Sequence, residues 1–274
     1  MLPVAFTGFA GYFIYLPELS ASILLVSLGI LLQAVASSVL NQLQEIDLDR
    51  KMKRTENRPL PAGKISVSAA LLFFLFNLLG GTVLIYYFGN LTAALVGLFT
   101  LFWYNVIYTY SKRITAFAVV PGSLTGALPP FIGWTAAGGA LLDKPIVFVG
   151  FLLFIGQVPH FWLLVLKYGE EYANAGIPSL TRVLSRPQIN RLSFTWVVTS
   201  AVSALFLSYF EVIQSKIIVS LLMIASFYLI WSFRGMITGP ESNIPFRRNF
   251  ILLNSYFLLI LIFLVVDRIV LNGY

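Results

Sequence analysis

The chain has 274 residues, of which 58% are hydrophobic and only 11% are charged. This composition, with a mean hydropathy of +0.87, is typical of a protein that crosses a membrane several times and leaves no room for a soluble domain. The net charge of +7 would suggest nucleic-acid binding in a soluble chain, but here it fits the positive-inside rule, and the absence of cysteine excludes disulfides and cysteine–metal sites.

Nine apolar segments are long enough to cross a bilayer. Because a backbone in lipid must satisfy its own hydrogen bonds, each is predicted to be a helix. We therefore expect an all-α integral membrane protein with about nine transmembrane helices in one domain, residues 1–274. The predicted segments are 3–17, 20–40, 67–89, 91–110, 116–138, 145–166, 192–210, 216–237 and 250–271.

The basic residues predict how these segments are oriented. Fifteen of the eighteen lysines and arginines fall in the loops after the second, fourth, sixth and eighth segments, and the other side holds only Lys144, Lys216 and Arg268. The positive-inside rule then places those four loops and the N-terminus in the cytoplasm and the C-terminus outside. We expect a cell membrane of the bacterial inner-membrane type.

The most charged stretch, residues 41–62, follows the second segment. On a helix, Asn41, Glu45 and Asp49 lie four residues apart and share one face. One amide and two carboxylates can hold Mg²⁺ through oxygen, and the basic residues just beyond them can hold a phosphate. The pattern predicts a magnesium–diphosphate site at the membrane surface. The alternative is an ordinary cytoplasmic loop, against which the regular spacing argues. The basic residues are Arg50, Lys51, Lys53, Arg54 and Arg58.

A further pair of basic residues, Lys112 and Arg113, lies between the fourth and fifth segments, at the cytoplasmic surface. In the fifth segment, Gly122 and Gly126 predict close helix packing, and the pair Pro129–Pro130 predicts a break or kink. Four aromatic residues either line a cavity and face a carbocation that develops there, or form an aromatic belt at the membrane interface. They are Tyr104, Tyr108, Tyr110 and Trp134.

A second acidic cluster, Glu170 and Glu171, lies where the sixth segment reaches the cytoplasm. Because the two acidic clusters follow helices four apart on one membrane side, they suggest two related halves that face one cavity, although coincidence is the alternative. Both clusters could bind Mg²⁺ that bridges one diphosphate. His160, the only histidine, lies about two turns before these acids. It could hydrogen-bond a neighbour, relay protons or bind a metal centre.

Three blocks resemble, in the same order, the UbiA-type intramembrane prenyltransferases and, within them, the branch that modifies heme. The blocks are NQLQEIDLDRKMKRTENRPLPAG, YTYSKRITAFAVVPGSLTGALPPFIGW and PHFWLLVLKYGEEYANAGIP. The resemblance implies a bundle around a central cavity that opens to lipid. It also implies Mg²⁺-dependent transfer of a farnesyl group from farnesyl diphosphate to a vinyl group of heme B, which gives heme O. Proteins of heme A synthesis or terminal-oxidase assembly would be the downstream partners.

The resemblance also assigns roles to single residues. Asn41, Glu45 and Asp49 match the family's first metal motif, and Glu170 and Glu171 replace its common Asp pair. The family's diphosphate-binding positions are matched by Lys51, Arg54, Arg58, Lys112 and Arg113. Its catalytic positions are matched by Lys112, Arg113 and His160, and His160 lies in the family's Pro-His-Phe motif.

Two departures concern the N-terminus and the acceptor. The chain starts after the family's usual Lys-Pro-Arg segment, and GIPSLTRVLS departs from the usual pattern near the second motif. The alternatives are therefore a relative that prenylates a quinone-type aromatic ring or another lipid, and a secondary transporter with the acids as ion sites. Against the transporter, the acids lie at helix ends rather than near the membrane midplane.

Overall fold

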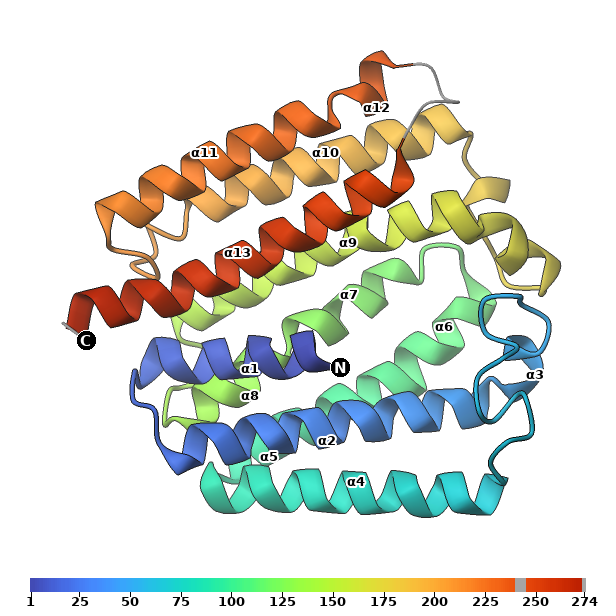
Figure 1. The fold of residues 1–274 in the computed structure, drawn as a ribbon, viewed down its shortest axis with the longest axis horizontal. Helices are drawn as coiled ribbons and strands as arrows, with labels where there is room; N and C mark the ends of the chain where they lie inside the picture. The colour runs from blue at the N-terminus through green and yellow to red at the C-terminus, as the bar shows by residue number, and fades with distance from the viewer. Residues whose placement is uncertain (240–244, 273–274) are drawn as a thin grey trace.

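The computed structural model describes residues 1–239 and 245–272, and this part of the chain is helical throughout, without strands (Figure 1). The elements are α1 (Leu2–Tyr15), α2 (Ala21–Gln44), α3 (Ile46–Asp49), α4 (Val67–Phe88), α5 (Leu91–Phe102), the π-helix η1 (Trp103–Tyr108), α6 (Thr109–Ile114), α7 (Val119–Ala127), α8 (Pro129–Ala136), α9 (Lys144–Asn174), the 3₁₀ turn η2 (Leu180–Arg182), α10 (Arg186–Leu205), α11 (Lys216–Phe233), α12 (Gly235–Thr238) and α13 (Phe246–Asn272).

Every predicted span coincides with a helix or with a broken helix, so the all-α membrane fold is confirmed. In the described residues, six helical stretches are long and apolar enough to cross a membrane: α2, α4, α5 to α6, α9, α11 to α12, and α13. The other three predicted spans are not among these six stretches, each for its own reason. α1 has only 14 residues, α7 and α8 are two short helices, and α10 begins with the polar sequence RPQINRLS.

The break in the fifth predicted span lies where the prolines stand. α7 ends at Ala127 and α8 begins at Pro129. Proline has no backbone N–H and is therefore tolerated in the first turn of a helix but not in its interior. The prediction of a break at Pro129–Pro130 is confirmed.

The ends of α2 and α9 lie beyond their predicted ends, both at the charged end of the bundle. α2 continues to Gln44 rather than residue 40, and α9 continues to Asn174 rather than residue 166. Hydropathy ends where polar residues begin, whereas the helical hydrogen bonds continue past that point. As a result, Asn41, Glu170 and Glu171 lie on the helices themselves and not in loops.

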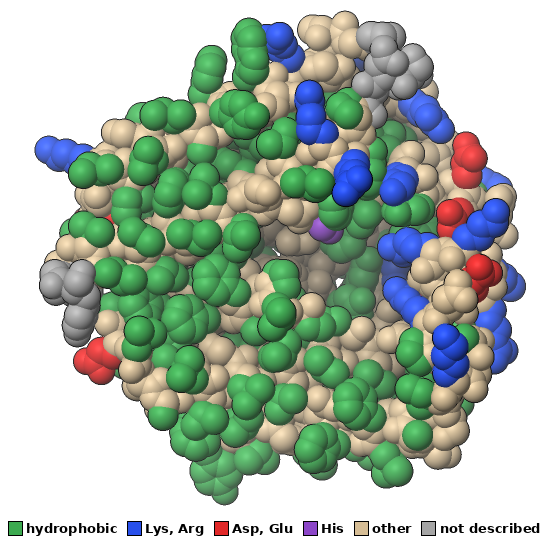
Figure 2. Space-filling view, viewed as in Figure 1, with side chains coloured by type: hydrophobic (Ala, Val, Ile, Leu, Met, Phe, Trp, Pro, Cys, Tyr) green, Lys and Arg blue, Asp and Glu red, His purple; other side chains and the backbone are tan. Residues whose placement is uncertain are grey.

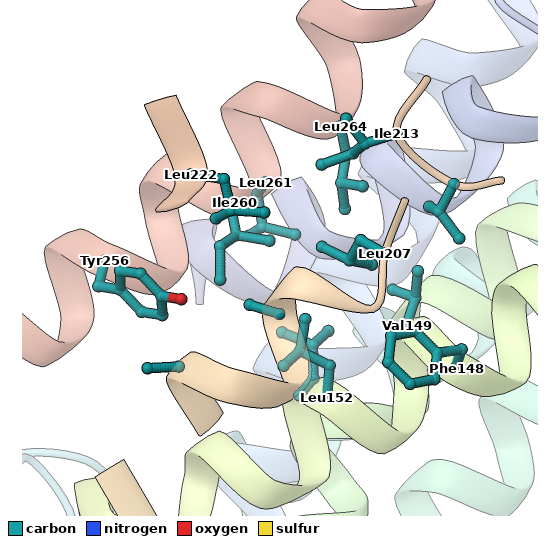
Figure 3. Packing of buried hydrophobic residues seen from close by; sticks show 14 of the residues in the cluster. Phe148, Val149, Leu152, Leu207, Ile213, Leu222, Tyr256, Ile260, Leu261 and Leu264 are labelled. Atoms are coloured by element: carbon teal, nitrogen blue, oxygen red, sulfur yellow. The ribbon is translucent and has the colours of Figure 1, made fainter. Parts of the chain in front are cut away.

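The C-terminal half has its own apolar core, in which α9, α10, α11 and α13 meet. Figure 3 shows residues of α9, α11 and α13 pointing toward one another, together with two residues of the turn after α10. Burial of such side chains against neighbouring helices fixes how these four helices pack. The labelled residues are Phe148, Val149, Leu152, Leu207, Ile213, Leu222, Tyr256, Ile260, Leu261 and Leu264.

Charge is distributed unevenly along the bundle. On the face seen in Figure 2, most lysines and arginines gather at the end of the molecule where α3 lies, while hydrophobic side chains cover the rest. That end also holds the C-terminal part of α9 (Figure 1). Arg54, in the loop after α3, donates a hydrogen bond of 3.0 Å to the hydroxyl of Tyr172 on α9. The two acidic clusters therefore lie on the same side of the bundle, as predicted.

Candidate active site

The first acidic motif keeps one helical face across a break in the helix. α2 ends at Gln44 and α3 begins at Ile46. The backbone N–H of Glu45 nevertheless donates to Asn41 O (3.0 Å), and that of Asp49 donates to Glu45 O (2.8 Å). Since the four-residue hydrogen bonds continue, all three side chains line one cavity, as the spacing predicted.

These three side chains are almost fully enclosed by protein. Asn41 and Glu45 are 7% exposed and Asp49 is 1% exposed. Asn41 Nδ2 donates to Glu45 Oε2 (2.9 Å) and to Thr109 Oγ1 (3.2 Å). Both side-chain hydrogen bonds of Asn41 to described residues use Nδ2, so its amide oxygen is available together with the two carboxylates as a set of oxygen ligands.

Each carboxylate of the motif is paired with one cation. Lys112 Nζ lies 2.8 Å from Glu45 Oε1 and 2.9 Å from Glu45 Oε2. Arg58 Nη1 donates to Asp49 Oδ2 at 2.8 Å. A buried carboxylate without such a partner would destabilise the fold strongly. Arg54 adds a third cation to the cavity wall, so positive charge reaches this cavity from α6 and from the loop after α3.

The cavity has a volume of about 270 Å³ and combines a polar end with an aromatic wall. Tyr104, Tyr108 and Phe161 form that wall, with ring centroids 5.4 Å apart for the two tyrosines and 6.1 Å apart for Tyr108 and Phe161. A second, more apolar cavity of about 250 Å³ shares Tyr104 with the first and is lined by α1, α2, α5, α7, α8 and α9. Tyr104 thus lines both cavities.

The second acidic cluster is placed differently from the prediction. Glu170 has an 86% exposed side chain, lies 3.7 Å from Arg186 and is not on the cavity wall. Glu171 is half-buried and also absent from that wall, and its Oε2 has no hydrogen-bond partner among the described residues. Helix α9 turns Tyr172, rather than these acids, toward the cavity. The geometry therefore argues against Glu170 as a metal ligand and leaves Glu171 as a prediction.

The remaining predicted residues also separate into two groups. Arg54, Arg58 and Lys112 line the cavity, whereas Lys51 and Arg113 are exposed and do not. Arg113 instead donates to Gln44 O at 2.7 Å. His160 lies on neither cavity wall, and Nδ1 of its ring is 3.0 Å from Asn254 Oδ1.

The four aromatic residues and the two glycines can now be placed as well. Tyr104 and Tyr108 line the cavity, whereas Tyr110 is exposed and Trp134 is buried away from it. An added Cβ would lie 2.6 Å from the ring of Tyr108 at Gly122 and 2.8 Å from the side chain of Gln157 at Gly126, which confirms the predicted close packing at both glycines.

Magnesium fits the oxygen set of the first motif. Mg²⁺ usually binds through one or two carboxylates, together with substrate phosphates and waters, rather than through a cage made by protein alone. Glu45, Asp49 and the amide oxygen of Asn41 match that set. Residues 1–239 and 245–272 contain no group of three or more His, Cys, Asp or Glu side chains that could hold a metal ion.

Sequence reasoning missed the polar residues that support this motif. Asn105, only 1% exposed, donates to Ser37 O (3.0 Å) and accepts from Ser37 Oγ (2.8 Å), which ties η1 to α2. Thr109 Oγ1 donates to Tyr104 O (2.9 Å) and receives the amide of Asn41. A polar side chain inside an apolar span is itself a signal of function, so Asn105 could have been singled out.

The comparisons with known proteins agree with this geometry. A family model described as the UbiA prenyltransferase family matches residues 4–264. A protein of Oleidesulfovibrio alaskensis named protoheme IX farnesyltransferase is 34% identical over 89% of this chain and 84% of its own length. One with the same name from Geobacter sulfurreducens is 38% identical over 73% of this chain and 74% of its own.

Solved structures show the same fold at low sequence identity. Digeranylgeranylglyceryl phosphate synthase superposes with a TM-score of 0.77 at 19% identity, covering 98% of this chain and 94% of its own. A UbiA homolog from Archaeoglobus fulgidus bound to GPP and Mg²⁺ superposes with a TM-score of 0.70 at 16% identity, covering 99% and 97%. The extent of the family match and the identity to these relatives show that this chain belongs to the UbiA prenyltransferase family.

Proposed function

We propose that this chain is a protoheme IX farnesyltransferase, which transfers the farnesyl group of farnesyl diphosphate to a vinyl group of heme B and so makes heme O. The observation that carries the proposal is the agreement of relatives 34–41% identical to this chain, all named protoheme IX farnesyltransferase. The cavity supports it, because acids and bases converge beside an aromatic wall. A transporter does not explain this arrangement, and the family is one of enzymes.

The donor is bound at the polar end of the cavity. Asn41, Glu45 and Asp49 would hold Mg²⁺ together with the diphosphate, and the bound ion would neutralise negative charge that develops on the leaving group. Arg54, Arg58 and Lys112 then stabilise the diphosphate by charge-assisted hydrogen bonds. Lys51, Arg113 and Glu171 remain candidates for outer positions around this site.

The aromatic wall receives the allylic carbocation. The faces of Tyr104, Tyr108 and Phe161 carry negative charge density, which attracts a cation. The same rings keep most water away from the reacting carbon. The farnesyl tail continues past Tyr104 into the second cavity, whose wall includes Ile30, Leu101 and Ile132.

The chemical step follows from the two substrates. The bond between C1 of the farnesyl group and the diphosphate oxygen breaks, and the diphosphate leaves with the electron pair. The terminal vinyl carbon of heme B forms the new bond to C1, which leaves a cation on the carbon beside the porphyrin. Water adds to that carbon and loses a proton, so the product carries the farnesyl group and one hydroxyl.

The proposal includes the orientation in the membrane. The charged end of the bundle, with the diphosphate site, faces the cytoplasm, because fifteen of the eighteen basic residues follow the second, fourth, sixth and eighth predicted spans and so fall on one side of the membrane.

The test is incubation of the purified protein in detergent with heme B, farnesyl diphosphate and Mg²⁺. Mass analysis should find heme with one added farnesyl group and one added hydroxyl, and chelation of Mg²⁺ should abolish its formation. Unchanged heme, together with prenylation of a quinone-type aromatic ring offered in parallel, would reject heme B as the acceptor.

A further inference from the structure

A polar pair lies in the middle of two apolar spans, where α9 packs against α13. His160 Nδ1 is 3.0 Å from Asn254 Oδ1. Asn254 is exposed and His160 is half-buried. Figure 2 shows the chain's only histidine, in purple, inside the hollow near the centre of this face. Polar side chains at such depth usually face a cavity or a ligand, and the diphosphate site uses neither of these two.

The hydrogen bonds of Asn254 decide which nitrogen of His160 carries the proton. Asn254 Nδ2 donates to Phe250 O at 2.6 Å, which turns its Oδ1 toward the histidine. Oδ1 can only accept, so His160 Nδ1 is the donor and Nε2 keeps its lone pair. An imidazole whose second nitrogen is held in this way is the usual arrangement of a histidine that binds a metal centre.

An aromatic wall connects this histidine with the diphosphate site. The ring of His160 lies 4.8 Å from that of Phe250 and 5.5 Å from that of Phe161. Phe161 in turn contacts Tyr108, whose ring lies 5.0 Å from Lys112 Nζ. A flat aromatic ligand bound at His160 would therefore have its edge beside the wall that receives the prenyl carbocation.

Two cations lie along the contact between α9 and α13, which we call the seam, and they are closer to the charged end of the bundle than His160 is. Lys167 is seven residues after His160 on α9, which is about 10 Å along a helix. Its Nζ lies 4.9 Å from the ring of Phe246, where α13 begins, and Arg247 is the next residue and is exposed. Among the described residues, neither Lys167 nor Arg247 forms an ion pair with a carboxylate. The seam thus offers two cations to a ligand with two carboxylates.

We propose, on the basis of the function proposed above, that the acceptor heme binds between α9 and α13, with His160 Nε2 as the axial ligand of its iron. Asn254 is the positioning residue that holds the imidazole, and Lys167 and Arg247 bind the two propionates. The vinyl groups lie on the porphyrin edge opposite the propionates. This orientation therefore directs the vinyl groups away from Lys167 and Arg247, which we call the basic rim, and into the apolar part of the molecule, next to Phe161.

The first experiment measures heme binding by its Soret absorption, in detergent free of phospholipid. Compared with the wild type, His160→Ala should shift the Soret band and weaken heme binding by more than tenfold, and added imidazole should restore the band. Loss of a partner that orients a metal-binding histidine costs about 10- to 100-fold in affinity. Asn254→Leu should therefore weaken binding to that extent, whereas Asn254→Asp keeps an acceptor oxygen and should retain most of it.

A matched control separates this role from a structural one. Asn77 on α4 donates a bond of the same kind to Phe73 O at 2.7 Å, far from His160 in the sequence. Asn77→Leu should leave the Soret band unchanged. Farnesyl diphosphate binding should remain in every variant, which shows that each variant is folded. An unchanged Soret band in His160→Ala, or an equal loss in Asn77→Leu and Asn254→Leu, would overturn the proposal.

The second experiment tests the basic rim with heme and its dimethyl ester. The double variant Lys167→Gln/Arg247→Gln should weaken binding of heme about tenfold or more and should not change binding of the ester. If both ligands bind the double variant as they bind the wild type, the rim serves lipid phosphates instead and this placement of heme is wrong.

The two proposals can fail separately. If the wild type farnesylates heme while His160→Ala keeps the wild-type Soret band, only the heme-binding seam is wrong. If the wild type shows an imidazole-dependent Soret band but makes no farnesylated heme, the proposed function is wrong although the seam binds heme.

Discussion

Two carboxylates of the first acidic motif are enclosed by protein, and each has one cationic partner. Lys112 pairs with Glu45, and Arg58 pairs with Asp49. Two buried charges of one sign are tolerated here only because cations neutralise them. We expect the same cations to turn to the diphosphate when Mg²⁺ takes their place beside the carboxylates.

Asp49→Ala should lower kcat by more than 100-fold, because it removes one proposed metal ligand and releases Arg58. The matched control is Asp47→Ala, two residues away, whose side chain is 91% exposed and contacts only Arg50 at 3.6 Å. It should lower kcat less than threefold. The measurement is the steady-state rate at limiting Mg²⁺. An equal loss of kcat in Asp49→Ala and Asp47→Ala would contradict the assignment of Asp49 as a metal ligand.

Lys112→Met should lower both the thermal unfolding temperature and kcat, the latter by at least tenfold. The variant leaves Glu45 buried without a cation, and an uncompensated buried charge destabilises a fold by about 3–5 kcal/mol. Arg113→Met removes the neighbouring cation, which is exposed, donates to a backbone carbonyl of α2 and lies 5.5 Å from the centre of the Tyr110 ring. Its stability should stay close to that of the wild type. The measurement is the thermal unfolding temperature without substrate. An equal unfolding temperature for Lys112→Met and Arg113→Met would contradict the proposed role of Lys112 as the partner of Glu45.

At the scale of elements, the site depends on where helices depart from regular α geometry. The π-helix η1 places Tyr104, Asn105 and Tyr108 on the side that meets α2 and the cavity. Such single-turn departures often occur at functional sites. The sequence did not predict η1, because residues 91–110 were interpreted as one continuous apolar span.

Gly122→Ala should disturb the aromatic wall. A Cβ at this position on α7 would lie 2.6 Å from Cε2 of Tyr108, so the ring would have to move away from its contacts with Phe161 and Lys112. We expect at least a tenfold lower kcat with little change in expression. Gly80→Ala, where the nearest atom is 3.7 Å away, is the control and should keep full activity. Equal activity of the two variants would show that the position of this ring does not matter.

At the scale of the whole molecule, the bundle separates a charged end from an apolar body (Figure 2). Both cavities have walls from α2, η1, α7 and α9; α6 also lines the polar cavity, and α1, α5 and α8 also line the apolar one. For the function proposed above, this arrangement offers the diphosphate the charged end and offers the prenyl chain and the porphyrin the apolar body.

Labelling of single cysteines tests this polarity, since the natural chain has none. Cysteines at Glu56 and Asn174, both exposed at the charged end, should react with an impermeant reagent from the cytoplasmic side. A cysteine at Leu142, 83% exposed between α8 and α9, should react only from the other side. Reaction of positions 56 and 174 from opposite sides would overturn both the topology and the shared site.

The sequence by itself determined the helices and the first acidic motif, because both depend on local periods. Apolar length defines a membrane span, the four-residue spacing puts Asn41, Glu45 and Asp49 on one face, and Pro129–Pro130 ends a helix. Only the tertiary structure decided which residues from distant helices meet. It brought Lys112, Tyr108 and Phe161 to the motif and left Lys51, Arg113 and Glu170 outside the cavity. The physical reason is that rotation and packing of each helix depend on side-chain contacts with its neighbours, such as Gly122 against Tyr108, and no period within one segment contains that information.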